Sequence, residues 1–502
     1  MSNLSELLPT GGGQNAVDFV ASGTLSSGQA VVLKTDGTVS PATGTAVSDA
    51  FTSEVATNGS SSVQGGYVVA HDPDNNKTLL AYGNMADSQY GYARIATIAA
   101  DGTTTLGTQL LFKSASVGII SAAYVGNGSF VIVWTDDIGT YMRSRALTVS
   151  GTTITYGTEV VLNSSATYIS PVSLVYNPVV QACAVIAGKS SNYAFMFRFT
   201  VSGNTITNDA AASDNINSLL GNANSTSSEM ALTINSTTGE LFAVWKKSAA
   251  GVPGYGGAMQ MSAGGGANSF TATGGTAVRF DGSSGVSNFS GLAYDSTNDR
   301  YVVVYQNDTN DYMTANVASV ASGATTWGTG TVFKAEASST TGNGATSFNP
   351  TTSKIVTLYR KDGNPLNVKY VTGSVSGLSV TWSAETYLSP AALSTLNFTV
   401  YNSNIQRTLV SYVRSSVAYI RNFLVGGTTP NYTDFIGITA EAISDTATGA
   451  VNVYGGINEA QTGLTIGSDY YVQENGSLST ATSTVKVGKA ISATTINMMD
   501  LT

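Results

Sequence analysis

The sequence has very few of the residues from which most catalytic and metal sites are built. Its 502 residues include one cysteine, Cys183, and one histidine, His71. No disulfide can therefore form within the chain, and neither a multi-histidine nor a four-cysteine zinc site can be assembled. A Ser-His-Asp triad would have to use His71 as its histidine. We expect no cofactor and no enzymatic activity.

Charge is also scarce, at 11% of residues against roughly 25% in an average globular protein. The formal net charge is −9, which argues against binding to nucleic acid, because such a surface needs a basic stripe. No run of 18 apolar residues occurs, so insertion into a membrane is not expected. Residues 1–15, MSNLSELLPTGGGQN, lack the basic and apolar regions of a secretory signal.

The residues that are abundant are neutral. Hydrophobic residues make up 42% of the chain and glycine occurs 54 times, so a core can be buried and wholesale disorder is not expected. The neutral, polar remainder suits an extracellular protein. Without an export signal, such a protein could leave its host by cell lysis, as virion proteins do, although the composition would also suit a cytoplasmic protein.

One pattern recurs seven times: an apolar strand, a turn that usually opens with Asp or Asn, and a second apolar strand that usually ends in Tyr or Trp. The turn residues are Asp72, Val125, Asn177, Asn235, Asp295, Asn349 and Asn402. The closing residues are Tyr82, Trp134, Ala187, Trp245, Tyr305, Tyr359 and Tyr412. In both sets successive members lie 52 to 60 positions apart, so the two sets define one repeat.

Most repeats continue with a third strand that begins near an aromatic residue and an outer strand of the type GTxxxF. Four short strands in about 50 to 60 residues are typical of one blade of a β-propeller. We therefore expect an all-β fold with a propeller of about seven blades over residues 51–428. Six or eight blades, a parallel β-helix and a row of sandwiches are the alternatives. The segment Gly44–Val55 resembles the outer strand that the last repeat lacks, and we expect it to close the ring.

The two ends of the chain resemble each other. Leu25 aligns with Leu464 and Gly28 with Gly467, and each segment contains a DG or NG turn, the strongest short signal for a β-hairpin. Either end alone is too small to bury much core. We therefore expect residues 16–50 and 429–502 to form one small β-barrel or β-roll, with the propeller inserted between them. Two separate mini-domains are the alternative.

The segments Phe19–Ser40 and Phe435–Ile496 resemble modules of structural proteins of tailed bacteriophages. With a propeller between them, the chain looks like virion proteins of marine phages such as those of cyanobacteria. The resemblance implies a non-enzymatic protein of the virion surface, a decoration or appendage of the head or tail. It also implies other virion proteins as partners, and a homo-oligomer or many copies on the particle. It transfers no catalytic residue.

Within this resemblance each part of the chain has an expected role. The terminal domain would anchor the protein, and the propeller would project toward a host-surface polysaccharide or protein. Residues 1–15 would form an extended arm that orders against a neighbouring virion subunit, because the segment has no partner pattern in the chain. Its candidate attachment residues are Leu4, Leu7, Leu8 and Pro9. A tail fibre or receptor-binding protein, a lectin-like propeller and a glycosidase are the alternatives.

Tyrosines and isolated charges follow the second strand of most repeats, in loops that would share one face of a propeller. Tyrosine with sparse charge suits recognition of sugars or proteins. The candidate ligand-binding residues are Tyr90, Tyr141, Tyr193, Tyr255, Tyr312, Lys246, Asp308 and Lys361. A ring of solvated loops without a ligand is the alternative.

The remaining chemistry-bearing residues have plainer expected roles. We expect His71 at the end of a strand and Cys183 in the core. Residues 72–76 (DPDNN) and 307–311 (NDTND) have oxygen ligands at a calcium-like spacing, but they lack the flanking Gly and terminal Glu of an EF-hand loop. Since Asp and Asn also open β-turns, we expect turns there and no metal site.

Overall fold

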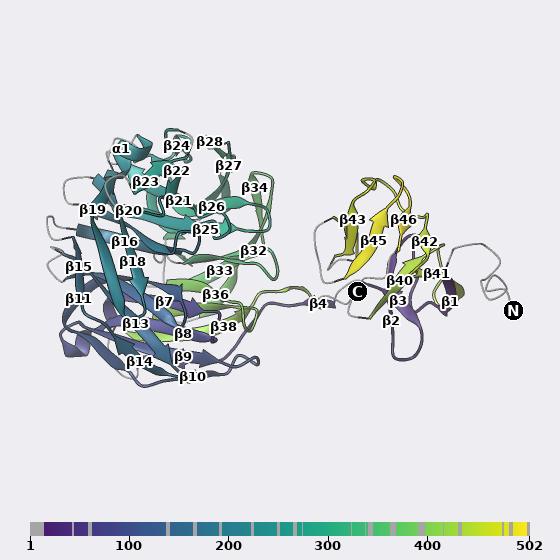
Figure 1. The fold of residues 1–502 in the computed structure, drawn as a ribbon, viewed down its shortest axis with the longest axis horizontal. Helices are drawn as coiled ribbons and strands as arrows, with labels where there is room; N and C mark the ends of the chain where they lie inside the picture. The colour runs from purple at the N-terminus through teal and green to yellow at the C-terminus, as the bar shows by residue number, and fades with distance from the viewer. Residues whose placement is uncertain are drawn as a thin grey trace. The chain divides into compact units, whose positions relative to one another are not determined.

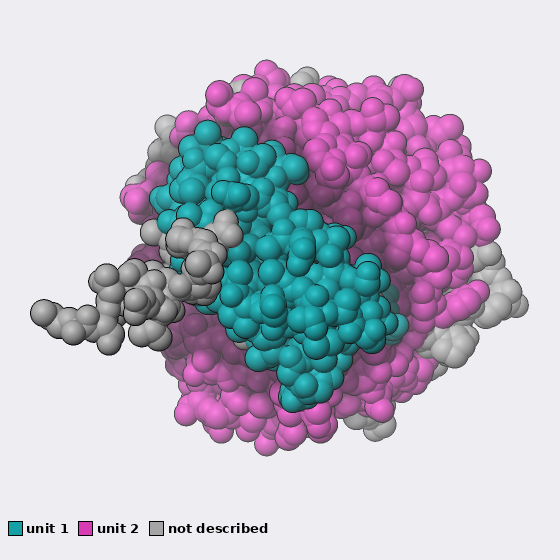
Figure 2. Space-filling view, turned by 90° about the vertical axis from the view of Figure 1, so that its right-hand side faces the viewer, with its two compact units in different colours: residues 1–49, 426–502 teal, residues 50–425 magenta. Residues whose placement is uncertain are grey.

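The computed structural model describes residues 15–42, 45–58, 63–136, 141–163, 168–189, 193–221, 225–247, 252–264, 269–273, 275–322, 324–336, 338–339, 345–361, 368–389, 397–414, 416–429, 434–473, 476–480 and 485–498. The chain divides into two compact units, which Figure 2 distinguishes by colour. Unit 1 comprises residues 1–49 and 426–502, and unit 2 comprises residues 50–425. Among the described residues, no helix is long and apolar enough to cross a membrane.

The first four blades of unit 2 follow one another along the chain (Figure 1). Blade 1 contains β7 (Val63–Asp72), β8 (Lys77–Asn84), β9 (Tyr90–Ile98) and β10 (Thr104–Leu106). Blade 2 contains β11 (Leu110–Gly126), β12 (Ser129–Asp136), β13 (Met142–Ser150), β14 (Thr153–Tyr156) and β15 (Val160–Asn163). Blade 3 contains β16 (Tyr168–Asn177), β17 (Ala182–Lys189), β18 (Tyr193–Ser202) and β19 (Thr205–Asn215), followed by α1 (Ile216–Leu220). Blade 4 contains β20 (Ser225–Ile234), β21 (Glu240–Lys247), β22 (Gly254–Met261), β23 (Phe270–Ala272) and β24 (Val278–Arg279).

Three further blades complete the ring. Blade 5 contains β25 (Val286–Asp295), β26 (Arg300–Asn307), β27 (Met313–Ala321), β28 (Ala324–Trp327) and β29 (Thr331–Lys334). Blade 6 contains β30 (Ser338–Ser339), β31 (Thr346–Asn349), β32 (Lys354–Lys361), β33 (Val368–Ser376), β34 (Ser379–Trp382) and β35 (Thr386–Ser389). Blade 7 contains β36 (Asn397–Asn402), β37 (Arg407–Arg414), β38 (Val417–Leu424), β5 (Ala50–Phe51) and β6 (Val55–Ala56). The first strands of neighbouring blades pack together, and β36 packs against β7, so the described residues form a closed propeller of seven blades.

The outer strand of a blade is usually made of two pieces, and both pair with the third strand. In blade 2, β14 and β15 both pair with β13, and in blade 5, β28 and β29 both pair with β27. In blade 1 the second piece is the start of β11, which pairs with β9 and then runs on into blade 2 to pair with β12. The turn-rich, glycine-containing pattern at the end of each repeat corresponds to this interruption.

Blade 7 borrows its outer strand from the other end of the propeller sequence. Phe51 pairs with Phe423, and Val55 pairs with Ile420, so β5 and β6 complete the sheet that β36, β37 and β38 begin. The expected closing segment is thus confirmed over residues 50–55. The first part of the expected segment does not join blade 7. It contains β4 (Thr45–Val47), which belongs to unit 1 and pairs with β39 (Gly427–Thr429).

The recurring Asp or Asn opens the hairpin turn, and at some positions its side chain also forms a hydrogen bond to a neighbouring blade. The Asn177 Oδ1 atom accepts hydrogen bonds from the N–H groups of Val179 and Val180, an Asx turn that starts the hairpin. Its Nδ2 atom donates to Gly239 O of blade 4 at 2.9 Å. Asn402 makes the same kind of link across the ring closure, to Asn76 Oδ1 of blade 1. Blade 2 has Val125 at this position because its hairpin turn is shorter, with Gly126 paired to Ser129.

The aromatic residues that close the second strands are core residues. Trp134, Tyr82 and Tyr412 have no exposed surface, and Tyr305 has 2%. Burial raises the pKa of Tyr82 to about 12, so its ring stays neutral. These side chains fill the space between successive sheets, which is why the repeat keeps them.

Unit 1 consists of two five-stranded sheets with the same internal arrangement. The first has the order β1 (Ala16–Val20), β41 (Thr448–Val453), β40 (Phe435–Thr439), β2 (Ala30–Leu33) and β3 (Val39–Pro41). The second has the order β42 (Ile457–Asn458), β46 (Ile496–Asn497), β45 (Lys486–Ala490), β43 (Asp469–Val472) and β44 (Leu478–Ser479). Both ends of the chain thus share the first sheet, as expected for a small β-domain built from both termini.

The two sheets also match residue by residue. Leu33 pairs with Val39 in the first sheet, and Val472 pairs with Leu478 at the aligned positions of the second. A Cβ on Gly437 would lie 2.1 Å from Asn452 O, and a Cβ on Gly488 would lie 2.1 Å from Asn497 O. Unit 1 is therefore an internal duplication. The first copy carries the propeller between β3 and β40, where the second copy has only residues 480–485 between β44 and β45.

Candidate recognition surface

The connections between second and third strands lie at one end of the propeller, because each blade repeats the same antiparallel order. We call this end the loop face. The five candidate tyrosines stand at or beside the start of a third strand: Tyr90 in β9, Tyr141 before β13, Tyr193 in β18, Tyr255 in β22 and Tyr312 before β27. The structure therefore brings the five backbone positions to one face.

These tyrosines are not equivalent within their blades. Tyr255 pairs directly with the buried anchor Trp245, whereas Tyr90 lies two residues before the partner of Tyr82. Tyr141 and Tyr312 share the register of Tyr90. Side chains two residues apart on a strand point to the same side of the sheet, so the rings of Tyr90 and Tyr255 lie on the same side of their blades as the anchors Tyr82 and Trp245.

The described tyrosine rings of the loop face are half-buried. The guanidinium of Arg143 lies 5.3 Å from the centre of the Tyr141 ring, and the ammonium of Lys247 lies 5.8 Å from that of Tyr255. Each cation covers one face of its ring. A ligand would meet rings that are already held in place, with a positive charge beside them.

The two charged candidates that the structure describes differ in availability. Lys246 is half-buried, and its Nζ atom donates to Ser287 O at 2.7 Å. Asp308 is exposed, while its backbone N–H donates to Gly285 O at 3.3 Å. Lys246 therefore has a structural partner in blade 5, and Asp308 presents its carboxylate to solvent.

Some expected site residues lie outside the part of the chain whose side chains the structure describes. Tyr193 and Lys361 are described by their backbone only. The attachment residues Leu4, Leu7, Leu8 and Pro9 fall within residues 1–14, outside the described residues.

Three glutamates organise the charge on the loop face, and the sequence analysis missed them. Glu54, Glu159 and Glu385 each stand directly before the second piece of an outer strand, β6, β15 or β35. Their local sequences are TSE, GTE and SAE, which mark the same blade position. The common position was therefore visible in the repeat, but the partners were not.

Glu159 and Glu385 each join two blades. Glu159 is 2.7 Å from Lys113 of the blade before it and 2.6 Å from Arg143 of its own blade. Burial by itself raises the pKa of Glu159, but the hydrogen bonds from Lys113 and Arg143 outweigh it and lower the pKa. The carboxylate is therefore ionised at neutral pH and binds the two blades together.

Glu385 repeats this arrangement between blades 5 and 6. Its carboxylate is 2.9 Å from Lys334 Nζ and is also bonded by Lys369 and by the hydroxyl of Tyr359. Burial by itself raises the pKa of Glu385, but hydrogen bonds from Lys369, Tyr359 and Lys334 lower it to about 2. Lys369 is only 3% exposed, so Glu385 is its charge partner within the protein.

Glu54 makes the corresponding contacts within blade 7, between the closing segment and β37. Its carboxylate is 2.7 Å from Arg414 Nη2 and accepts a hydrogen bond from the Tyr412 hydroxyl. Because Glu54 lies at the start of the propeller sequence and Arg414 lies near its end, this ion pair helps to hold the ring shut. The loop face therefore carries half-buried tyrosines together with three glutamate-centred clusters, two of which join neighbouring blades.

His71 and Cys183 lie where the sequence predicts. Burial lowers the pKa of His71, and its ring nitrogens are 3.2 Å from Thr78 Oγ1 and 3.0 Å from Asn404 Oδ1. Both nitrogens thus have partners, one of them in blade 7. Cys183 is fully buried, and burial raises the pKa of its thiol.

The two calcium-like segments form turns. Asp72 Oδ1 accepts from the N–H groups of Asp74 and Asn75, and Asn307 Oδ1 accepts from that of Thr309. These oxygens are engaged by their own backbone. Within the described ranges, no group of three or more His, Cys, Asp or Glu side chains could hold a metal ion.

No family model and no curated protein matches this chain. Among solved structures it is similar to AofleA from Arthrobotrys oligospora, with 7% identity over 71% of this chain and 94% of that one, and a TM-score of 0.40. It is also similar to the C-terminal WD40 domain of Sif2, with 12% identity, 75% and 99% coverage and a TM-score of 0.42. It is similar as well to the periplasmic gluconolactonase PpgL of Pseudomonas aeruginosa, with 12% identity over 79% of this chain and 98% of that one, and a TM-score of 0.43.

Proposed function

We propose that this chain is a non-enzymatic surface protein of a tailed-phage particle, attached through unit 1 and displaying the propeller. The observation that carries the proposal is the duplication in unit 1, because the propeller takes the place of a short connection between two strands. The chain leaves and re-enters unit 1 through the paired strands β4 and β39. An insertion of this kind adds a second surface without interrupting the first.

Each unit has a hydrophobic core of its own, which supports a division of labour. Unit 1 contains a cluster around Val32, Ile438 and Val487, and another around Leu25 and Val451. The propeller closes on itself through β5 and β38. One unit can therefore bind neighbouring virion proteins while the other meets the host surface.

The loop face supports the recognition part of the proposal. Pre-positioned tyrosine rings with few free charges suit contacts made by stacking and hydrogen bonding. Such contacts are weak singly, but many copies on one particle add up through avidity. They should also depend little on salt, because the charges of the loop face are largely engaged within the protein.

Replacing Tyr141, Tyr255 and Tyr312 with Ala tests the recognition role. We expect the variant to remain folded and the adsorption of particles to host cells to fall about tenfold, because a few aromatic residues usually dominate such interfaces. Wild-type adsorption should change less than about twofold between low and moderate salt. Adsorption rates of wild-type and variant particles give the answer.

A matched control replaces Tyr156 with Ala, since Tyr156 is 44% exposed on β14 and pairs with Leu147, away from the start of β13. This control should adsorb normally. Normal adsorption by the triple variant would leave the propeller as a surface coat only. Release of sugar from a host polysaccharide by the wild-type protein would contradict the non-enzymatic part of the proposal.

A further inference from the structure

Several junctions between neighbouring blades are packed so closely that they have room only for glycine. At three of them, a glycine of one blade's outer strand faces the turn before the outer strand of the next blade. A Cβ on Gly157 would lie 1.7 Å from Asn204 O, and a Cβ on Gly328 would lie 2.0 Å from Leu378 O. Gly107 faces Thr152 in the same way, at 2.7 Å. These glycines let the neighbouring turn fill the junction.

The junction between blades 7 and 1 is built in reverse. Thr52 of the closing segment stands where these three junctions have glycine, and the facing turn carries Gly102. Gly102 has a φ of +90°, which side chains rarely adopt, and a Cβ there would lie 2.4 Å from Thr52 Cγ2. The glycine is therefore on the turn and the larger side chain is on the outer strand, and the Thr52 methyl group packs directly against the turn.

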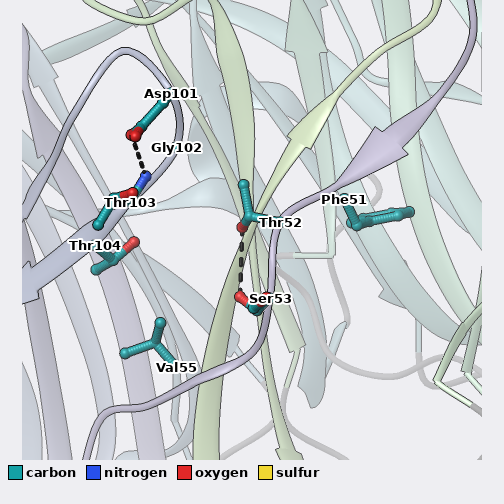
Figure 3. A pocket seen from close by; sticks show the side chains of 8 residues that line it. All are labelled: Phe51, Thr52, Ser53, Val55, Asp101, Gly102, Thr103 and Thr104. Carbon is teal, nitrogen blue, oxygen red and sulfur yellow. Dashed lines mark hydrogen bonds between the residues drawn. The ribbon is translucent and has the colours of Figure 1, made fainter.

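A cavity of about 440 Å³ remains at this junction (Figure 3). We call it the seam cavity. Its lining residues are Phe51, Thr52, Ser53, Val55, Asp101, Gly102, Thr103 and Thr104. The first four come from the closing segment and the others from the turn between β9 and β10, and the Phe51 ring points away from that turn. The volume lies within the range of roughly 300–1,000 Å³ typical of small-molecule sites.

The lining is rich in hydroxyl groups and is more polar than apolar. Thr52, Ser53 and Thr103 each contribute a hydroxyl, and so does Thr104. The single carboxylate, Asp101, accepts from the N–H of Thr103 at 2.8 Å. Arg407 Nη1 lies 3.2 Å from the point where a Cβ on Gly102 would stand, so one cation faces one anion. Such a lining can bond a neutral ligand with many hydroxyls.

The walls of the seam cavity are held rigidly by one strand. Asn422 of β38 donates from Nδ2 to Gly102 O at 2.9 Å and to Thr104 Oγ1 at 3.1 Å. Its backbone N–H donates to Thr52 Oγ1 at 3.0 Å. The side chain of Asn422 has no exposed surface. Both walls are therefore fixed before a ligand arrives, which lowers the entropic cost of binding.

We propose that the seam cavity is a binding site for a neutral saccharide of one or two hexose rings. Hydroxyls of the ligand would bond Asp101 and the threonine and serine hydroxyls, while Val55 would meet a ring C–H face. The site differs from the tyrosines of the loop face, because the β9–β10 turn lies at the opposite end of blade 1 from the β8–β9 connection. It is also independent of the virion assignment.

The test is ligand-observed saturation-transfer NMR on the full chain with the methyl α-glycosides of glucose, mannose and galactose, followed by titration. We expect at least one glycoside to bind. Ser53→Phe should weaken that binding at least about tenfold, because Ser53 is exposed and a phenyl ring can enter the cavity without disturbing the core. Asp101→Asn keeps an acceptor for Thr103 but removes the charge, and it should weaken binding less.

Ser376→Phe is the matched control, an exposed serine next to the corresponding turn of blade 6, and it should bind like wild type. No binding of any of the three glycosides would overturn the proposal. Equal binding by wild type and a folded Ser53→Phe variant would also overturn it, since the sugar would then bind elsewhere. Neither result bears on particle attachment, so failure here is distinct from failure of the proposed function.

Discussion

Replacing residues 43–433 with Thr-Ser-Thr is expected to give a folded, cooperatively melting protein that still joins particles. The three residues copy 482–484 of the second repeat, which join Ala481 to Val485 as residues 43–433 join Ala42 to Asp434. The aligned bonds are alike: Leu33 N donates to Asp434 O at 2.9 Å, and Val472 N donates to Val485 O at 3.0 Å. The short connection should therefore fit the first repeat. Circular dichroism and particle incorporation measure the outcome.

A second variant makes this test specific. In the shortened protein, Gly437→Val should prevent folding, because any Cβ at that position would collide with Asn452 O. Loss of folding in the Gly437→Val variant would show that the shortened chain depends on the duplicated strand register. A shortened chain that is unfolded without this change would mean that unit 1 needs the propeller, contrary to our account. A folded chain that fails to join particles would move attachment to the propeller.

Glu385→Gln should destabilise the propeller by about 2–3 kcal/mol, because it leaves the buried Lys369 without its charge partner. All four tryptophans of the sequence lie within residues 50–425, so tryptophan fluorescence during urea unfolding reports the propeller alone. The side chain of Glu336 is 50% exposed, and its carboxylate is 3.4 Å from the same Lys334. Glu336→Gln is therefore the matched control, with an expected cost under about 0.5 kcal/mol.

The effect of Glu385→Gln should depend on pH in one direction. The pKa of Glu385 is lowered from 4.5 to about 2 in the folded state, so its contribution is complete above pH 4.5. It is lost as the pH falls from 4.5 toward 2, where the wild-type carboxyl becomes neutral like glutamine. Wild type and variant should therefore converge in stability at low pH. A constant difference across this range would mean that the charge of Glu385 does not matter.

The propeller could be predicted from the sequence because its signals are local. Alternating strands, Asx turns and buried closing residues recur at one spacing, and each follows from contacts within a hairpin. Ala187 lacks the aromatic ring of the other closing residues, but it is buried at the same position of the repeat. Phe197 and Phe199 supply the bulk in its cluster. The closing strand could be predicted because Gly44–Val55 resembles the outer strand that the last repeat lacks.

The inter-blade features could not be predicted, because their partners lie far apart in the sequence. Glu159 meets Lys113 of the preceding blade across 46 residues, and Glu385 likewise meets Lys334 of blade 5. The seam cavity is lined by residues from positions 51–55 and 101–104, which only the packed ring brings together. The second half of the duplication was hidden for another reason: FIGIT and KVGKA of β40 and β45 share only the glycine at 437 and 488.

The central claim, that this chain is a particle component held by unit 1, is tested most directly by quantitative mass spectrometry of purified virus particles. The particles should come from cells that produce either the full chain or the chain without residues 43–433. We predict that both forms occur at the same fixed copy number per particle. Absence of the full chain from purified particles, or its complete removal by a mild salt wash, would contradict the account.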